Sequence, residues 1–294
     1  MHLPTPSILF IIPYFGQWPF WMPFFLESCR RNPDVDWLLF TDCGVPEGLP
    51  SNVRIEPIDY ESYCRLVSRR LDIHFAPVNA YKLCDLKPAL GYIHEEYLHG
   101  YDFWAFGDLD LVYGELRAYF TNQRLASRDF FSTHERRVAG HLCLIRNTDC
   151  KRSLFMNMPD WRERFCDETH HALDEGAFSR LFVRRKNLPR PLFNLLGQLN
   201  PLRRRSEFVE AYSTPNGCIA WHDGSHSFPK RWYWREGRVS NDLDDQRLYP
   251  YFHFACWKRN QWSKQAPPTA REVRRIAASA RWIITDRGFH QDGL

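Results

Sequence analysis

The sequence predicts an α/β protein with a mixed, mostly parallel sheet flanked by helices. Short runs of apolar, β-prone residues recur along the chain, and stretches with the helical spacing of apolar residues separate them. Alternation at these intervals is typical of parallel strands joined by right-handed crossovers. A chain of 294 residues can bury a substantial core in one large domain of this class, with an appendage.

The order of the expected elements follows from these patterns. Buried strands are predicted over residues 7–12, 36–42, 53–59, 102–106, 129–133 and 138–146. Helices are predicted over residues 19–31, 60–71, 79–98 and 172–183. Farther on, residues 212–221 and 230–234 are expected to form a pair of strands, and residues 270–284 an amphipathic helix.

The N-terminal 26 residues are apolar, but they lack a basic start and contain Pro13, Gly16, Pro19 and Pro23. They predict a buried strand and turn rather than a signal peptide or membrane span. Nine cysteines occur without a C-x-x-C pair or a zinc-site spacing, which predicts reduced thiols and a cytoplasmic protein.

The net charge and its distribution along the sequence limit which partners are expected. The formal net charge of +4 gives no reason to expect a nucleic-acid partner. Residues 180–205 carry eight Lys and Arg and no acidic residue, so this stretch is a loop over a phosphate, a patch facing an anionic membrane, or a solvated loop. The helix at 270–284 offers a second possible membrane contact at the inner face, although packing on the body is favoured.

The strongest candidate site follows the predicted strand at 102–106. Gly107 ends the apolar run, and Asp108 and Asp110 come at the carboxyl end of that strand, with one residue between them. Ligands of open α/β sheets bind beyond this edge. Two carboxylates presented there can share Mg²⁺ or Mn²⁺, which completes its coordination with substrate phosphates. The alternative is a helix N-cap or a turn.

Three D-x-D triplets occur, and only one has this context. Asp34 and Asp36 lie in a turn leading into a strand, and Asp242 and Asp244 lie in a polar run with no strand before it. The motif by itself is therefore weak evidence, and the preceding strand gives it meaning.

Lys82, Asp85 and Lys87 form the first of three further clusters. On a helix, Lys82 and Asp85 would share a face at i, i+3, with Lys87 near the same side. Such a set can hold a phosphate and a sugar hydroxyl. A surface ion pair explains the spacing equally well.

His253 and Lys258 form the second cluster. His253 stands between two Phe residues in a strand-like run, which is more typical of a core histidine than of a ligand. A neutral imidazole could nevertheless supply a third protein ligand to the metal. Lys258 could then neutralise a diphosphate leaving group.

The third cluster is Asp174 and Glu175, near the beginning of a predicted helix. An acidic pair there usually serves as cap and dipole partner. The functional interpretation is a general base for an acceptor hydroxyl, or a hydrogen-bond acceptor for a sugar. Gly140 and His141 interrupt a predicted strand, which indicates either close approach of a ligand or a bulge.

These residues together resemble the GT-A class of nucleotide-sugar glycosyltransferases, and more narrowly an uncharacterised family of bacterial glycosyltransferases associated with surface polysaccharides. The similarity covers most of the chain, through IIPYFGQWPFW, FTDC, YKLCDLKPALGYIHEEYLHGYDFWAFGDLDLVYGE, AGHLCLIRN, ALDEGAF and YFHFACWK. The long central stretch is specific, and the other motifs are supportive.

The resemblance implies a Rossmann-like GT-A domain over residues 1–265, with a nucleotide-binding half at 1–125 and an acceptor and metal half at 126–265. A C-terminal amphipathic helix at 266–294 would form an acceptor-side extension. Pro13, Tyr14 and Phe15 would lie near the base and ribose of the donor. Asp108, Asp110 and a C-terminal His, at the place of His253, would hold the metal.

The implied activity is transfer of a hexose from a nucleotide sugar, with UDP favoured, to a hydroxyl of a cell-surface glycan or lipid-linked precursor. The His253 pattern resembles retaining families more than inverting ones. Two alternatives stay open at this point. One is a haloacid-dehalogenase-like phosphatase that uses Asp108 as nucleophile, and the other is a non-catalytic carbohydrate-binding protein.

Overall fold

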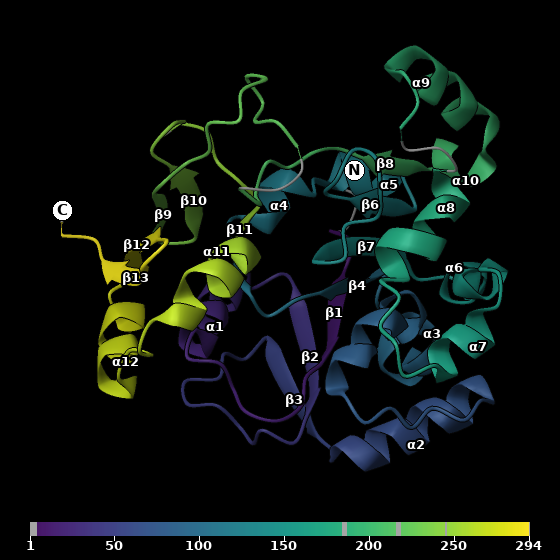
Figure 1. Ribbon diagram of the computed structural model, residues 1–294, viewed down its shortest axis with the longest axis horizontal. Helices are drawn as coiled ribbons and strands as arrows, with labels where there is room; N and C mark the ends of the chain where they lie inside the picture. The colour runs from purple at the N-terminus through teal and green to yellow at the C-terminus, as the bar shows by residue number, and fades with distance from the viewer. Residues whose placement is uncertain (1–4, 184–186, 216–218, 245, 294) are drawn as a thin grey trace.

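A central sheet crosses the computed structural model, which describes residues 5–183, 187–215, 219–244 and 246–293 (Figure 1). Its strand order is β3-β2-β1-β4-β7-β6-β8. The strands are β3 (Val53–Pro57), β2 (Asp36–Thr41), β1 (Ile8–Pro13), β4 (Phe103–Gly107), β7 (Leu142–Arg146), β6 (Phe130–Ser132) and β8 (Ser206–Phe208). Strand β7 is antiparallel to β4 and β6, and the other pairs are parallel. The predicted fold class, a mixed and mostly parallel sheet, is confirmed.

Both faces of this sheet are buried, as the continuous apolar runs of the strands require. In β1, Ile8, Phe10 and Ile12 enter one core, and Leu9 and Ile11 enter the other. The same alternation with period two runs through β2, β4 and β7.

Helices cover the two faces of the sheet. One face packs against α1 (Met22–Arg30), α4 (Leu116–Tyr119) and α5 (Asn122–Ser127). The other face packs against α2 (Tyr60–Leu71), η1 (Ala80–Ala89), α3 (Leu90–Ile93), η2 (Glu95–Leu98), η3 (Leu154–Asn157), α7 (Trp161–Cys166), η4 (Asp174–Phe178) and α8 (Ser179–Phe182). At the periphery lie α6 (Asp149–Arg152), α9 (Arg190–Leu199) and α10 (Pro201–Arg204).

A two-stranded ribbon joins the middle of the chain to its C-terminal part. Strand β5 (Leu111–Tyr113) pairs antiparallel with β11 (Tyr251–His253), with Leu111 opposite His253. The backbone N–H of Phe254 extends the pairing by donating to the carbonyl oxygen of Asp110 at 3.1 Å. The register of this ribbon therefore fixes where residue 253 meets residue 110.

The C-terminal part forms its own small sheet, in the order β10-β9-β12-β13. It consists of β9 (Trp232–Arg235), β10 (Arg238–Asn241), β12 (Arg281–Thr285) and β13 (Gly288–Gln291), accompanied by α11 (Ala255–Asn260), η5 (Trp262–Lys264) and α12 (Ala270–Ala278). The rings of Trp234 and Trp282 stack at 3.9 Å, and Trp234 Nε1 donates to the carbonyl oxygen of Tyr113 at 2.8 Å. Many of the tryptophans thus build a core and tie it to the ribbon.

The C-terminal helix is shorter than predicted. Helix α12 ends at Ala278, and Ala280 then takes a left-handed φ of 54° that turns the chain into the β12–β13 hairpin. Ile284, expected on the helix face, is buried in β12 instead. Spacing cannot separate the two structures here, because the last apolar positions satisfy both a helical and an alternating pattern.

The predicted strand at 212–221 is also wrong in its described part, and residues 216–218 lie outside the described residues. Strand β9 pairs instead with β10 and β12. The helix predicted at 79–98 is broken into η1, α3 and η2, and Pro88, which has no N–H to donate, lies near the end of η1. The strand predicted at 138–146 begins only at Leu142.

No helix within the described residues combines the length and the hydropathy of a membrane span.

His94 gives the fold a measurable pH dependence. It is fully buried, its ring stacks on Phe40 at 4.0 Å, and its Nε2 lies 2.9 Å from the hydroxyl of Tyr63. Burial, with a smaller contribution from Arg70, lowers its pKa to about 3. In the unfolded chain this imidazole is protonated below about pH 6.5, whereas in the folded protein it stays neutral.

As the pH is lowered, we expect the free energy of unfolding to decrease more steeply in the native protein than in a His94→Gln variant. The difference should appear between pH 6.5 and 4.5 and approach about 1.4 kcal/mol per pH unit. Urea unfolding at several pH values measures it. Carboxylates titrate in both proteins and cancel, so parallel curves would contradict a buried neutral His94.

Candidate functional site

A cavity of about 1070 Å³ opens at the carboxyl ends of β1 and β4. Its lining includes Pro13, Tyr14 and Phe15 after β1, and Asp108 and Asp110 after β4. This is the edge at which open α/β sheets bind ligands.

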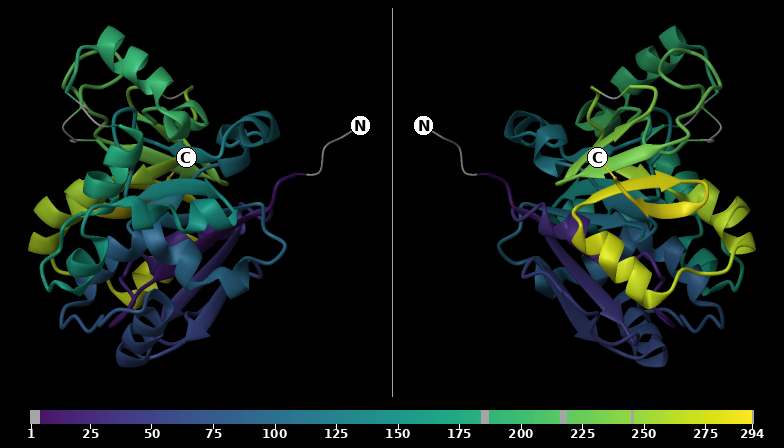
Figure 2. Two further views of the ribbon diagram at one scale, coloured as in Figure 1. Left: turned by 90° about the vertical axis from the view of Figure 1, so that its right-hand side faces the viewer. Right: turned by 90° about the vertical axis from the view of Figure 1, so that its left-hand side faces the viewer.

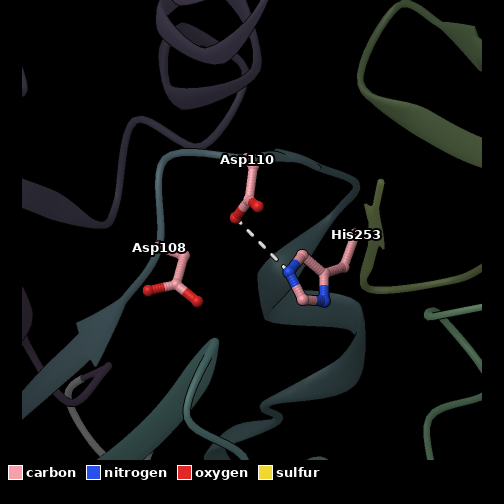
Figure 3. Close-up of side chains that lie close together, drawn as sticks. All are labelled: Asp108, Asp110 and His253. Atoms are coloured by element: carbon pink, nitrogen blue, oxygen red, sulfur yellow. Dashed lines mark ion pairs between the residues drawn. The ribbon is translucent and has the colours of Figure 1, made fainter. Parts of the chain in front are cut away.

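Asp108, Asp110 and His253 lie together in this cavity (Figure 3). One potential ligand atom from each residue lies within 4.8 Å of the other two. Asp110 immediately precedes β5 and His253 ends β11, so the ribbon brings together residues distant in the sequence. His253 Nε2 is 3.3 Å from Asp110 Oδ1.

The chemistry of this donor set fits a divalent metal. Two carboxylates and one imidazole suit Mn²⁺ or Mg²⁺ with further oxygen ligands from a substrate. His253 Nε2 is buried, and among the described residues its near polar neighbour is the Asp110 carboxylate of the same cluster, while its Nδ1 lies 3.1 Å from the hydroxyl of Thr214. A hydrogen bond on one ring nitrogen orients the other, as is usual for metal-binding histidines.

Two lysines neutralise the carboxylates of this cluster. Lys87 Nζ lies 2.5 Å from Asp108 Oδ1, and Lys258 Nζ lies 2.5 Å from Asp110 Oδ2. Burial alone would raise the pKa of Asp110, but His253 and Lys258 together hold it well below its usual range. Burial likewise opposes the charge on Lys87, yet Asp108 raises the pKa of its ammonium group well above the usual value. Asp110 and Lys87 are therefore charged at neutral pH despite their burial.

Asp174 is the third aspartate that lines the cavity. It opens the π-helix η4, is almost fully buried, and its Oδ2 is 3.9 Å from Lys87 Nζ. Burial raises its pKa to about 6, more than Lys87 lowers it. A carboxyl with such a pKa can exchange a proton near neutral pH. Leu173 holds the N-cap position of η4, but the Asp174 Oδ1 also accepts a hydrogen bond of 2.8 Å from the backbone N–H of Glu175, so part of the cap-like role that the sequence left open is present.

Gly140 allows Asp174 to occupy this place. A Cβ at position 140 would overlap Oδ2 of Asp174. Residue 140 lies in a turn before β7 rather than within a strand. The close approach that the glycine predicted is present, but the group that approaches it is the Asp174 carboxylate of the protein and not a ligand.

Glu175 and His141 also line the cavity. Glu175 Oε2 accepts a hydrogen bond of 2.7 Å from Arg137 Nη1, which engages this carboxylate. The His141 ring stacks on His253 at 4.3 Å, and its Nε2 lies 2.7 Å from the hydroxyl of Tyr251. Burial lowers the pKa of His141 well below its usual value, so its imidazole is neutral.

Lys82 and Asp85 do not line the cavity, so their predicted contact with phosphate and sugar is corrected. They form a buried ion pair of 3.0 Å. Lys82 donates to the carbonyl oxygens of Arg164 and Thr169, and Asp85 accepts from the backbone N–H groups of His171 and Leu173. The pair anchors the loop that leads to Asp174. Such a buried pair needs every partner satisfied, and sequence spacing could not reveal those partners.

Several lining residues lie outside the sequence prediction. They are Trp21, Tyr81, His134, Arg137, Glu210, Thr214 and Trp221. Nothing in their local sequence distinguishes them from surface or core residues, because long-range contacts alone bring them to the cavity.

The phosphatase alternative loses support in this geometry. Its second acidic pair would be Asp244 and Asp245, but Asp245 lies outside the described residues. Asp244 is absent from the described cavity lining and accepts hydrogen bonds from Trp221, His222 and Tyr249. Asp108 also follows the fourth strand of the chain rather than the first.

Comparison with known proteins gives a family and a set of similar structures. No curated protein matches the sequence. The matched structures include an active-site mutant of LgtC, with 10% identity, 92% of this chain, 95% of that chain and a TM-score of 0.44. Mouse xyloside xylosyltransferase 1, in its apo form, matches with 11% identity, 85% of this chain, 99% of that chain and a TM-score of 0.43. These matched structures are glycosyltransferases, but TM-scores below 0.5 carry neither activity nor substrate over to this chain.

The family assignment comes from the sequence itself. A family model described as "Family of unknown function (DUF6625)" matches residues 10–289. Because this match spans nearly the entire chain, the protein belongs to the DUF6625 family.

Proposed function

We propose that the protein is a metal-dependent GT-A-type glycosyltransferase. It moves a hexose from a nucleotide sugar, with UDP as the carrier, to a hydroxyl of a cell-surface glycan or glycolipid precursor. The nucleotide-binding half is residues 1–125, and the acceptor and metal half is residues 126–265. The reduced-thiol composition supports a cytoplasmic location.

One observation carries this proposal. Asp108, Asp110 and His253 converge at the strand-end edge of a mixed α/β sheet, inside a large cavity with a lysine on each carboxylate. This combination matches the needs of a diphosphate bound through a divalent cation, because acids hold the metal and ammonium groups balance the phosphates.

Asp108, Asp110 and His253 would hold Mn²⁺ or Mg²⁺, which when bound supplies Lewis-acid stabilisation of the leaving phosphate. Lys87 and Lys258 carry the positive charges of the site. Their ammonium groups pair with the carboxylates in the free protein and become available to phosphate oxygens once the carboxylates are otherwise engaged. They would thus stabilise charge on the departing nucleoside diphosphate.

The donor base and ribose are assigned to the segment after β1. Tyr14 lines the cavity and stacks on Trp18 at 5.6 Å with an interplanar angle of 7°, and the N–H of Gly16 donates to Asp42 at 2.8 Å. Aromatic stacking of this kind makes a firm platform beside a ligand.

Asp174 and Glu175 are assigned to the transfer itself, beside the donor sugar and acceptor hydroxyl. Asp174 is buried next to Lys87, and Glu175 is held by Arg137. Gly140 and His141 complete this wall of the cavity. We assign retention of configuration, in which the departing phosphate takes the acceptor proton and Asp174 orients the sugar.

Nucleotide binding is the first prediction that follows from this function. With Mn²⁺ present, UDP or a UDP-hexose should raise the melting temperature, because ligands that bind only the folded state stabilise it. A thermal-shift panel of UDP-, GDP-, CMP- and dTDP-sugars with and without Mn²⁺ measures this. Asp110→Asn should lose the Mn²⁺-dependent part of the shift. An equal response to the entire panel, or none, would count against glycosyl transfer.

Lys258→Gln is the second prediction. Without the ammonium group at Asp110, Mn²⁺ alone should stabilise the variant more than it stabilises the native protein. UDP with Mn²⁺ should bind about ten-fold more weakly, because a charge-assisted contact to phosphate is lost. Titration calorimetry resolves both effects. Lys264→Gln, an exposed lysine outside the cavity lining, is the matched control and should change neither.

Gly140→Ala is the third prediction. The added methyl group must displace the Asp174 carboxylate, and misplacement of about 1 Å can lower turnover by about 100-fold. We expect release of UDP from the UDP-hexose to fall at least about ten-fold, while UDP still raises the melting temperature. Gly176→Ala is the control, because a Cβ there meets nothing closer than 3.8 Å. Equal activity of the two variants would show that the position of the Asp174 carboxylate does not matter for the reaction.

A further inference from the structure

Helix α9 has an unusual relation to the rest of the molecule. It projects from the body near α8 and α10, at the upper right of Figure 1, and both views in Figure 2 place it at the outer edge. Phe193 is its buried residue, which packs under the guanidinium of Arg136 at 5.3 Å.

The apolar side of α9 faces outward. Leu192, Leu195, Leu196 and Leu199 are 44%, 55%, 43% and 73% exposed. Their spacing of i, i+3, i+4 and i+7 puts them on one side of the helix, so they form a continuous stripe. We call these four residues the leucine stripe. An amphipathic helix normally buries this side, but in the part of the chain that the structure describes the stripe stays exposed to solvent.

The segment that carries the leucine stripe is basic in sequence. Residues 180–205 carry eight Lys and Arg and no acidic residue, although the entire chain has a net charge of only +4. Arg190 and Arg204, at the two ends of the α9–α10 segment, are exposed. Residues 184–186, which are Arg, Arg and Lys, add charge but lie outside the described residues.

The segment that carries the leucine stripe contacts a loop that lines the cavity. Arg136 Nη1 donates to the carbonyl oxygen of Leu188 at 3.1 Å, and Arg190 pairs with Glu135 at 3.2 Å. The next residues on either side, His134 and Arg137, line the cavity. The segment that carries α9 is therefore seated on a loop that forms one wall of the site.

We propose that the leucine stripe docks the protein on an anionic lipid bilayer. Leucine side chains enter the boundary between headgroups and acyl chains, and exposed arginines of the same segment, such as Arg204, contact anionic headgroups. Docking there brings the 134–137 wall of the cavity close to the membrane. That position suits an acceptor carried on a lipid. This conclusion about the acceptor rests on the proposed function, whereas the proposed binding to lipid is independent of it.

The charge pattern selects a membrane over other occupants. A protein partner or a second copy of this chain would need to offer an acidic apolar groove, and α9 is flanked by basic residues alone between residues 180 and 205. The other amphipathic helix, α12, is not a candidate, because Val273, Ile276 and Ala277 are buried on the body. The packing of this helix on the body, which the sequence favoured, is confirmed.

Co-sedimentation of the full chain with vesicles tests the proposal. We expect binding to vesicles of phosphatidylcholine and phosphatidylglycerol in equal parts, little binding to phosphatidylcholine alone, and weaker binding at high salt. Leu195→Glu should weaken the interaction at least about ten-fold, and Leu199→Glu similarly. Val45→Glu is the matched control, since Val45 is 71% exposed in the loop after β2, and it should bind like the native protein.

The outcomes separate cleanly. Equal binding of the Leu195→Glu and native proteins, or no preference for phosphatidylglycerol, would overturn the proposal. Light scattering that shows a native dimer and a Leu195→Glu monomer would overturn it in favour of self-association. UDP with Mn²⁺ should stabilise the Leu195→Glu variant as it does the native protein. Loss of vesicle binding with intact nucleotide binding therefore concerns the docking surface, and failure of nucleotide binding concerns the proposed function.

Discussion

The antiparallel pairing of β5 with β11 is the constraint on which the site depends. Asp110 sits immediately before β5 and His253 at the end of β11, so a slip of one residue in this register would turn the imidazole to the opposite face of the ribbon. The register is held from outside by the N–H of Phe254 bonded to Asp110 and by the N–H of His253 bonded to Ser213. The aromatic C-terminal core adds a third restraint, because Trp234 bonds to Tyr113 within β5. The small sheet thus has a structural role in the geometry of a distant cluster.

Electrostatic balance decides how that cluster can exist in a buried place. Three aspartates converge on the cavity, and unpaired carboxylates would be expensive to desolvate. Lys87 lies between Asp108 and Asp174, and Lys258 neutralises Asp110. The lysines therefore hold the acids in position before any ligand arrives, which limits the reorganisation that binding requires. The same lysines compete with a cation for the carboxylates, so metal and phosphate should favour each other's binding.

The sequence was sufficient for the sheet and for the carboxylates, but not for their surroundings. The apolar run before Gly107 placed Asp108 and Asp110 at a strand end, and that local pattern needs no tertiary information. His253 was suggested by resemblance, since its two Phe neighbours also suit a core histidine, and only the ribbon distinguishes the two. Arg137 and Thr214 reach the cavity through long-range packing that leaves no local signature. The prediction that Lys82 and Asp85 contact a ligand was wrong, because an i, i+3 ion pair has the same spacing in the sequence whether it faces a cavity or a loop.

Helices α9 and α12 show the same limit from another side. The sequence predicts an amphipathic helix at 270–284 but treats 180–205 as a basic loop, whereas the structure forms helices α9 and α10 within that stretch. Periodicity also cannot say which side of an amphipathic helix meets the protein. Burial separates them, because α12 covers the aromatic C-terminal core whereas α9 uses one phenylalanine as its anchor and leaves four leucines outside. Exposing such a stripe costs solvation free energy that a globular fold ordinarily avoids. Its retention beside a basic segment and one loop away from the cavity is best explained by a surface that covers it during function.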